Sequence, residues 1–383
     1  MKENKVVTVL KKEPMLSVSV LSAIISIIIT NPSAQLLQDI DWKTLGTLLM
    51  MLSVLEGFKQ ESIFNPILNL ARKIKTQRGL TFFLVFCVFF SSMFVTNDVS
   101  LIIFVPITII LFRAGNKEKY IIPVLTFENI AAVRGSLLMP FGSPQNLFLY
   151  SQSGHSALTF ITHMSPLWVS SGLLLCVFIC FLYRKDPKQS TGVSDLDIAQ
   201  PWQAERSKNR FFYIALFAIV ITSIVTRTKY WPYVTLVVVG AIAIFDHQIL
   251  TKKVDYVLLL TFLCFFVFSS SICANPTISG FLSNAVAGYE YWWGILLSQL
   301  ISNVPASIVL WPFTKNLAAL LYGVDSAGLV SLIGSLASVI NFRIYAREYP
   351  GKGLAFIKGF TLISLCFFAI VVVPGYLLSS WQF

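Results

Sequence analysis

The chain has 383 residues, of which 56% are hydrophobic, 14% aromatic and only 12% charged. Several apolar runs reach the roughly 20 residues that a helix needs to cross hydrocarbon, which excludes a water-soluble globular protein and indicates a polytopic membrane protein. The net charge of +11 could suit nucleic acid in another context, but here the basic residues lie in loops between apolar runs, so no nucleic-acid partner is expected.

An all-α fold with nine membrane spans is predicted. In chain order, the spans are 15–31, 43–58, 120–150, 163–183, 211–226, 231–246, 254–272, 326–345 and 354–380. Two further apolar regions, 79–112 and 291–316, carry polar tips and are predicted to be re-entrant hairpins, which enter the membrane and return to the same side.

The first hairpin, 79–112, divides at the polar tip Thr96, Asn97 and Asp98. Each half has about 16 residues and reaches about 24 Å, against about 30 Å of hydrocarbon. Basic residues flank both ends of the region, so both ends are expected in the cytoplasm. Two tilted crossings with a short external turn would give the same charge pattern, but the short halves and the buried polar tip favour a hairpin.

Each tip is followed by a span that a polar, Gly-containing break interrupts. The interrupted spans are 120–150, which breaks at Gly142 to Asn146, and 326–345, which breaks at Gly334 to Ser338. A helix interruption inside a membrane persists only where protein or a water-filled cavity surrounds it. A tip and a break that both occur twice predict a duplicated transporter.

The loop charges orient the chain with its N-terminus in the cytoplasm. If each hairpin returns to its own side, the N-terminus and the cytoplasmic loops hold 24 of the 29 Lys and Arg residues. These loops are 59–78, 113–119, 184–210, 247–253 and 343–358. The charge distribution therefore predicts a multi-pass protein of the inner or plasma membrane.

The same order of elements is predicted twice, in opposite orientation: two spans, a connector, a hairpin, a broken span and a final span. The chain accordingly divides into a first inverted repeat at 1–183, a cytoplasmic loop and linking helix at 184–230, and a second inverted repeat at 231–383. Inverted repeats with interrupted helices are typical of secondary transporters whose site lies between the halves. Because no phosphate-binding Gly-rich loop with Lys is present, ATP-driven pumping by this chain is not expected.

Oxygen-bearing side chains gather at the tips and breaks and suit a hard cation, so Na⁺ or H⁺ is predicted as the coupling ion, with no other cofactor. One Na⁺ site is predicted at Thr96, Asn97, Asp98 and Asn146, and a second at Ser302, Asn303 and Ser338. The predicted substrate- and ion-binding set also includes Ser143, Gln145 and Ser335. No catalytic residue is predicted.

Two ionisable residues, Glu128 and Arg134, lie in the first broken span, where charge is costly enough to indicate function. Their i, i+6 spacing puts them on different faces of a regular helix. They could pair if Gly135 loosens the turn, or each could find another partner, and the sequence leaves both arrangements open.

The tips and breaks resemble motifs of the ion-transporter superfamily that includes arsenite permeases, sodium/proton antiporters and divalent-anion/sodium symporters. Thr96 to Asp98 with Pro106, and Ser302 to Ala306, are similar to its hairpin tips, and the two Gly-Ser breaks are similar to its unwound helices. The breaks look most similar to a bacterial arsenite-permease-like branch. The resemblance covers most of the chain and implies a scaffold domain, a transport domain with both hairpins, elevator-like alternating access and a homodimer.

The resemblance also implies which residues surround each ion. It places Thr96, Asn97, Ser143 and Asn146 around one ion, and Ser302, Asn303, Ser335 and Ser338 around its repeat-related partner. The chain departs from the Ser-Asn-Thr tips of dicarboxylate symporters, because Asp98 and Val304 occupy the third positions. A carboxylate at the tip would repel a dicarboxylate unless a cation or proton neutralises it.

The predicted function is a secondary active transporter that moves a small inorganic or organic anion, or exchanges Na⁺ and H⁺, with the bilayer and the small ion as partners. A passive ion channel is one alternative, although two closed tips provide no continuous pore. A membrane-embedded enzyme is another, but the polar residues do not converge as an acid, base or nucleophile would.

Overall fold

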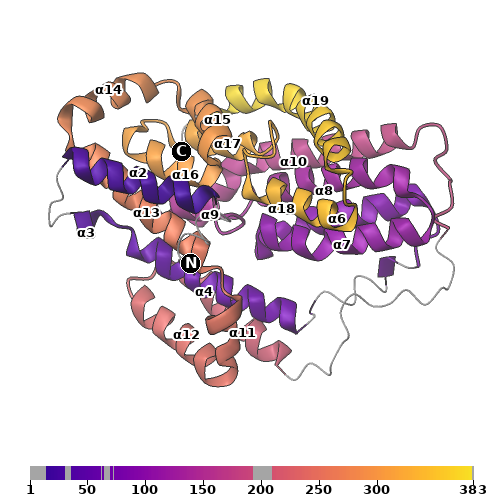
Figure 1. Cartoon of the computed structure of the whole chain (residues 1–383), viewed down its shortest axis with the longest axis horizontal. Coiled ribbons are helices and arrows are strands. Elements are labelled where there is room, and N and C mark those ends of the chain that lie inside the picture. Colours follow the sequence, from indigo (N-terminus) through magenta and orange to yellow (C-terminus); the bar gives the residue numbers. More distant parts are fainter. Residues whose placement is uncertain are drawn as a thin grey trace, which may run out of the picture.

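The computed structural model describes residues 14–30, 36–61, 63, 70–71, 73–192 and 209–381. This part of the chain is helical and contains no strand beyond an isolated bridge between Thr76 and Ser190 (Figure 1). The basic N-terminal residues, part of the predicted connector and most of the predicted loop 184–210 lie outside the described residues.

The helices follow one another in two series, separated by α11 (Arg210–Val225). The first series is α2 (Pro14–Thr30), α3 (Leu36–Asp39), α4 (Trp42–Gln60), α6 (Gln77–Val95), α7 (Asn97–Ala114), η1 (Glu118–Tyr120), α8 (Ile121–Gly135), α9 (Pro144–Ser153) and α10 (Ala157–Leu182). The second series is α12 (Trp231–Gln248), η2 (Ile249–Lys253), α13 (Tyr256–Ala274), α14 (Pro276–Val286), α15 (Glu290–Ile301), α16 (Asn303–Leu310), η3 (Trp311–Phe313), α17 (Leu317–Ala327), α18 (Leu336–Glu348) and α19 (Gly353–Ser379).

Six helical segments in the described residues are long and apolar enough to cross a membrane: α6, α7, α10, α12 together with η2, α13 and α19. Shorter apolar helices are α2, α11 and α17. The predicted all-helical membrane class is therefore confirmed. The predicted span 43–58 forms α4, which is not one of the six, because Lys43, Glu56 and Lys59 lower its hydropathy.

One premise of the hairpin prediction is wrong. Helices α6 and α7 have 19 and 18 residues, so each reaches roughly 27–28 Å and is nearly long enough to cross the bilayer. Polar and basic residues such as Arg78 and Arg113 extend these helices beyond the apolar window. By contrast, α15 and α16 have only 12 and 8 residues, so the half-length argument holds for the second pair alone.

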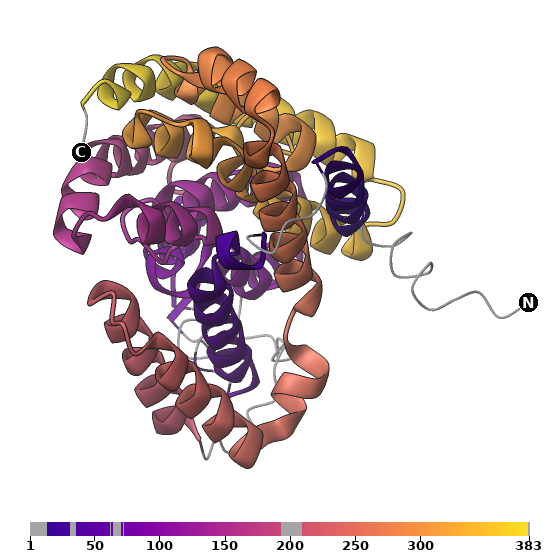
Figure 2. The same ribbon diagram turned by 90° about the vertical axis from the view of Figure 1, so that its left-hand side faces the viewer.

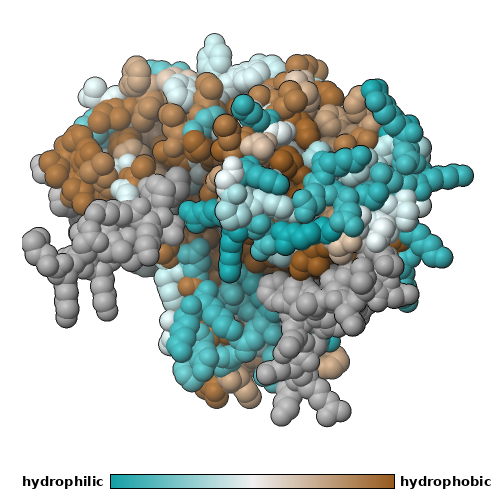
Figure 3. Space-filling view, turned by 45° about the vertical axis from the view of Figure 1, so that its right-hand side comes forward, coloured by the Kyte–Doolittle hydropathy of each residue, from teal (hydrophilic) through white to brown (hydrophobic). Residues whose placement is uncertain are grey.

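The outer surface of α11 and α12 is apolar. Phe211, Leu236 and Ile244 are 88%, 73% and 82% exposed, respectively. Figure 3 shows hydrophobic residues across much of the upper left of one face and hydrophilic residues toward its right-hand side. Large apolar side chains at this exposure would be a liability in water, and they identify the surface that hydrocarbon covers.

Local sequence explains where the helices begin. The Asp41 carboxylate caps α4 by accepting a hydrogen bond from the Thr44 N–H at 2.9 Å, and the Ser143 hydroxyl caps α9 in the same way. Pro144 occupies the first turn of α9, where its missing N–H costs nothing. These residue types satisfy N–H groups that helix ends leave free, which fixes the point at which α9 resumes after the break.

Glycine brings two helix pairs into backbone contact, one in each series. A Cβ added at Gly135 of α8 would lie 2.0 Å from the carbonyl oxygen of Phe89 in α6. A Cβ added at Gly323 of α17 would lie 2.4 Å from the carbonyl oxygen of Tyr291 in α15. Small residues at such crossings let helices pack tightly in a membrane, where no hydrophobic force drives them together.

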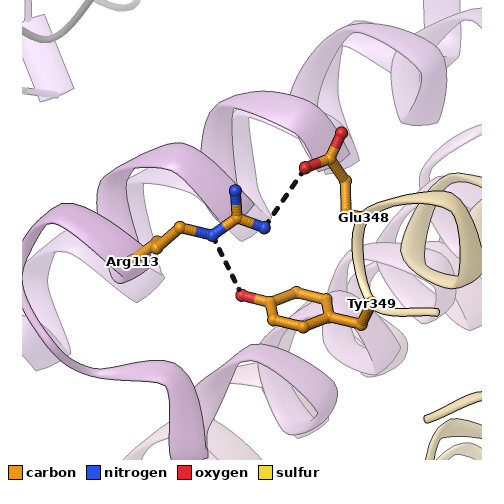
Figure 4. Close-up of polar contacts among 3 residues, drawn as sticks. All are labelled: Arg113, Glu348 and Tyr349. Atoms are coloured by element: carbon orange, nitrogen blue, oxygen red, sulfur yellow. Dashed lines mark hydrogen bonds and ion pairs between the residues drawn. The ribbon is translucent and has the colours of Figure 1, made fainter. Parts of the chain in front are cut away.

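The two series interlock at the centre of the molecule. Helix α9 packs against α16 and α17, while α18 packs against α7 and α8. At the end of one of these contacts, Arg113 Nη2 donates to Glu348 Oε2 at 3.2 Å and Nε donates to the Tyr349 hydroxyl at 3.4 Å (Figure 4). Both charged side chains are 43% exposed, so this ion pair orients α7 and α18 but adds little stability.

Helices α4, α11 and α12 pack together at the lower side of the molecule in Figures 1 and 2. Gln60 at the end of α4 donates to Asp246 Oδ2 at 2.6 Å and accepts from Lys253 Nζ at 2.5 Å. Elsewhere, α2 packs along α13. None of these helices supplies a tip or a break.

Gly323→Ala is expected to lower the free energy of unfolding by about 1–3 kcal/mol, which is the usual cost of overpacking a tight contact. The new methyl group would meet the Tyr291 backbone, which cannot rotate away as a side chain can. Thermal unfolding of the protein in detergent measures the change.

The control for this substitution is Gly240→Ala on α12, where nothing lies within 4 Å of an added Cβ. It should keep the Tm or raise it slightly, because alanine is the better helix former. Equal Tm values for the Gly323 and Gly240 variants would contradict the close approach of α15 and α17.

Candidate ion site at the helix interruptions

The two predicted tips share one unusual backbone conformation. Thr96, between α6 and α7, has φ 69° and ψ 157°, and Ser302, between α15 and α16, has φ 70° and ψ 159°. This region is favourable almost only for glycine and costs another residue about 1–3 kcal/mol. The same strain at both tips, borne by residues with a hydroxyl group, is evidence that those side chains serve a purpose.

Each tip is held by the break of its own series. The Asn97 N–H donates to the Gly142 carbonyl at 3.3 Å, and the Asn303 N–H donates to the Gly334 carbonyl at 3.2 Å. A Cβ added at Gly142 would lie 2.2 Å from the Ser136 carbonyl oxygen, and one added at Gly334 would lie 2.1 Å from the Ala327 carbonyl oxygen. Neither glycine can therefore be replaced without a shift of the backbone. The predicted tips and breaks are thus brought together in pairs.

The first tip presents a carboxylate oxygen without a hydrogen-bond partner. Asp98 lies half-buried in the first turn of α7, and its Oδ1 is enclosed without a hydrogen-bond partner. The helix N-terminus favours negative charge there. Asn97 is buried, and its Oδ1 accepts a hydrogen bond from the Asp98 N–H at 2.9 Å, so the carboxylate of Asp98 is the free acceptor of this tip.

The first break turns its amides toward the second series. Gln145 Nε2 donates to Asp325 Oδ1 at 3.0 Å. With its amide oriented as these surroundings require, Asn146 nitrogen lies 2.9 Å from Asp325 Oδ2 and 3.1 Å from Oδ1. Gln145 and Asn146 were predicted as ligands beside the first tip. Their nitrogen atoms bind a carboxylate on α17, which leaves Gln145 Oε1 buried without a partner.

Asp325 is a buried charged residue at the interruptions that the sequence analysis does not single out. It is buried near the end of α17, next to Ser326, whose hydroxyl oxygen accepts a hydrogen bond from Arg134 Nη2 at 3.3 Å. The Nε and Nη1 atoms of Arg134 have no partner. A lone acidic residue in the apolar stretch 317–327 was the available signal, and it lay just before the predicted start of the broken span at 326.

The second tip is neutral. The Ser302 hydroxyl lies 3.5 Å from Asn303 Oδ1, and Asn303 Nδ2 is buried without a partner. Ser335 begins α18 in an extended conformation but makes no side-chain cap, so its hydroxyl is not committed to the helix. The Ser338 hydroxyl is also engaged by the first series, because it accepts a hydrogen bond from Asn129 Nδ2 at 3.0 Å.

Glu128 and Arg134 do not pair with each other. The Glu128 carboxylate accepts a hydrogen bond from the Thr108 hydroxyl on α7, whereas Arg134 reaches Ser326 on α17. The sequence left open whether the two residues pair with each other or bind separate partners, and the structure shows separate partners.

A pocket of about 320 Å³ opens beside the interlocked centre, against α9 and α16. Its wall includes Asp39, Asp41 and Gln152, together with Ile308 and Trp311. The residues at the interruptions themselves are closed in: Asn97, Ser143 and Asn303 are each at most 3% exposed. An ion that reaches them needs a movement of the surrounding helices.

Thr96→Gly is expected to make the protein about 1 kcal/mol more stable than Thr96→Ala, because glycine adopts this backbone conformation without strain. Thermal unfolding compares the two variants. At Thr222, an exposed position in α11, the order should reverse, since glycine is the poorer helix former. The same order at both positions would argue against strain at the tip.

Asp325→Leu is expected to cost about 3 kcal/mol or more, because it removes the acceptor of the Gln145 and Asn146 amides and the negative charge whose field acts on the buried guanidinium of Arg134. The double variant Arg134→Met/Asp325→Leu should recover part of that loss. Thermal unfolding of both single variants and the double variant completes a double-mutant cycle. Strict additivity of the two changes would show that Arg134 and Asp325 do not interact.

Comparison with known proteins agrees with a transporter. Residues 6–340 match the citrate transporter family (CitMHS). The inner membrane protein YbiR of Escherichia coli K12 is 32% identical over 314 residues, which is 80% of each chain. The uncharacterized transporter MJ0456 of Methanocaldococcus jannaschii is 30% identical over 331 residues, 86% of this chain and 87% of its own.

A third relative, the 46 kDa membrane protein of Mycobacterium leprae, is 21% identical and covers 89% of this chain and 88% of its own. The family and the named transporter relative are transporters rather than enzymes, so an enzymatic function is set aside. The resemblance to the ion-transporter superfamily is confirmed, while its arsenite-permease-like branch stays a prediction. The chain belongs to the citrate transporter family and is a multi-pass membrane transporter.

Proposed function

We propose that the chain is a secondary active transporter that moves a small anion across the cell membrane, coupled to Na⁺ or H⁺ bound at the tips. One observation carries the proposal: two tips with the same strained backbone, each held by the glycine carbonyl of its own break. Two equivalent interruptions of this kind are unnecessary for a structural role and give a transporter two matched ion sites.

The first tip is the favoured coupling site. Asp98 has an enclosed carboxylate oxygen without a partner, so a cation or proton there neutralises a charge that is otherwise costly in the membrane. Thr96 and Asn97 add hydroxyl and amide oxygens beside it. The second tip, with Ser302 and Asn303, is the uncharged partner site.

An anionic substrate fits the ends of the helices. Helices α7 and α16 begin at the tips, and α9 and α18 begin at the breaks, so four partially positive N-termini lie at the interruptions. Arg134 adds a buried guanidinium with two unfilled donors. Citrate or a related carboxylate is the first substrate to test, since the family takes its name from citrate. An arsenite-type oxyanion is the next.

Coupling follows from electrostatics. While Asp98 is ionised it repels an approaching anion, and when a cation occupies the tip that repulsion disappears. Cation binding would therefore precede anion binding and make the two interdependent. A channel has no need for such a gate, and the buried side chains at the interruptions favour alternating access over a continuous pore.

The arrangement of helices supports an elevator-type movement of an inverted-repeat protein. Helices α6 to α9 and α15 to α18 form the interlocked centre, whereas α4, α11 and α12 form a separate group with an apolar outer surface. In the proposal the interlocked centre moves and the other group is the scaffold, through which two copies would associate. The N-terminus is placed in the cytoplasm by the loop charges.

Transport by purified protein in proteoliposomes tests the proposal. Uptake of radiolabelled citrate, other di- and tricarboxylates, sulfate and arsenite is measured under an imposed Na⁺ or pH gradient. Asn97→Ala and Asn303→Ala are each expected to weaken cation-driven uptake about tenfold, which corresponds to the loss of one ligand worth about 1.4 kcal/mol.

The control variant is Asn284→Ala, on the exposed side of α14, which should transport as the unaltered protein does. Uptake that ignores both gradients would overturn coupling. Normal uptake by both tip variants would overturn the assignment of the ion sites to the tips.

A further inference from the structure

A buried glutamate that hydrogen-bonds to neither tip has no compensating charge beside it. Glu128, in the middle of α8, is fully buried, and its Oε1 accepts a hydrogen bond from the Thr108 hydroxyl of α7. Its Oε2 has no partner. Among the described residues, no Lys, Arg or His nitrogen lies within 4.0 Å of this carboxylate. A negative charge in such a place needs a positive partner that the chain does not supply.

Two asparagine oxygens, one on the residue that follows Glu128 in α8 and one on the neighbouring helix α18, are also buried without a partner. Asn341 Nδ2 donates to the Leu125 carbonyl at 2.7 Å, which commits the nitrogen of that amide and leaves Oδ1 free. Ser338 donates its hydroxyl hydrogen to the Gly328 carbonyl at 3.4 Å, so it can only accept from Asn129 Nδ2. The oxygen of Asn129 is therefore free as well.

These atoms belong to one meeting point of three helices. Leu125, Glu128 and Asn129 follow the i, i+3, i+4 spacing that places residues along one side of α8. Glu128 contacts α7 through Thr108, the other two positions contact α18, and α7 and α18 pack against each other. Three unpartnered acceptors thus lie along the part of α8 that faces both neighbours.

We propose that Glu128, Asn129 and Asn341 bind a Na⁺ ion between α7, α8 and α18, at a site separate from the two tips. All three free atoms are oxygen acceptors, which a hard cation prefers and an anion cannot use. A single carboxylate balances one positive charge, so a monovalent ion leaves the site neutral. A proton on Glu128 would satisfy one oxygen only, whereas Na⁺ can be shared by all three.

The site connects parts of the chain that the tips do not. Helix α7 begins at the first tip and α18 begins at the second break, so an ion here would hold the two together across α8. Its binding depends only on these three helices and stands whether or not the tips bind ions.

The test measures ²²Na⁺ binding to the full-length protein in detergent, together with the Tm in NaCl and in choline chloride of equal ionic strength. The unaltered protein should bind Na⁺ and show a higher Tm in NaCl. Glu128→Gln, which keeps the shape of the side chain, should lower the affinity of this site at least tenfold and abolish its share of the Tm shift. In choline chloride the same variant should be at least as stable as the unaltered protein, because the uncompensated carboxylate is gone.

Two comparisons isolate the site. Glu290→Gln is the matched control, since that buried carboxylate is already occupied by the N–H groups of Lys315 and Asn316 at 3.1 and 3.3 Å, and it should leave Na⁺ binding unchanged. In an Asn97→Ala/Asn303→Ala background, the Na⁺ binding that persists should disappear on adding Glu128→Gln or Asn341→Ala.

Full Na⁺ affinity and stoichiometry in Glu128→Gln would overturn the inference, as would a Tm that responds to pH but not to Na⁺. These outcomes are independent of the flux experiment. Coupled uptake with no sodium site at Glu128 would overturn only this inference. A sodium site at Glu128 without coupled uptake would overturn only the proposed function.

Discussion

Each helix interruption frees backbone N–H and C=O groups that hydrocarbon cannot satisfy, and this demand organises the centre of the protein. The Asn97 and Asn303 N–H groups donate to the carbonyls of Gly142 and Gly334, so each tip is paired with a break of its own series. Only glycine fits at those break positions, and only a buried location protects the pairing from lipid. The close helix packing and the enclosure of the polar side chains follow from the same requirement.

Buried charged side chains also need polar partners, and here each series supplies a partner for a charged side chain of the other. Asp325 on α17 accepts hydrogen bonds from the amides of Gln145 and Asn146, which follow the first break, while Arg134 on α8 reaches Ser326. A charge of one series is therefore solvated by the other. Separating the two series would leave both charges without these partners, so the contacts couple α17 to α8 and to the first break.

The tips and breaks could be located from sequence because they are marked locally. Polar residues and glycine inside apolar runs, with Ser143 as a cap and Pro144 in the first turn, identify helix ends without any knowledge of neighbours. Helix lengths were less predictable, because hydropathy marks the extent of lipid contact and not the end of the helix. The apolar region 79–112 therefore starts after α6 begins and stops before α7 ends, and the second broken span was expected at 326 although α17 begins at Leu317.

The partners of the polar residues could not be predicted. Asp325 lies 180 positions from Gln145, and nothing in the sequence near either residue announces the other. The same holds for Asn129, which meets Ser338 across 209 positions. Local sequence thus locates candidate ligands, but only the three-dimensional packing determines which of them face each other.

The glycine crossings at Gly135 and Gly323 have a mechanical consequence. Contacts between backbones cannot be loosened by a change of side-chain rotamer, so α6 with α8 and α15 with α17 behave as stiff units. A large displacement during transport would then take place outside these pairs, at their boundary with the other helices and with lipid. The turnover rate would then be governed by the thickness and composition of the surrounding bilayer, which act on that outer boundary and leave the helix pairs unchanged.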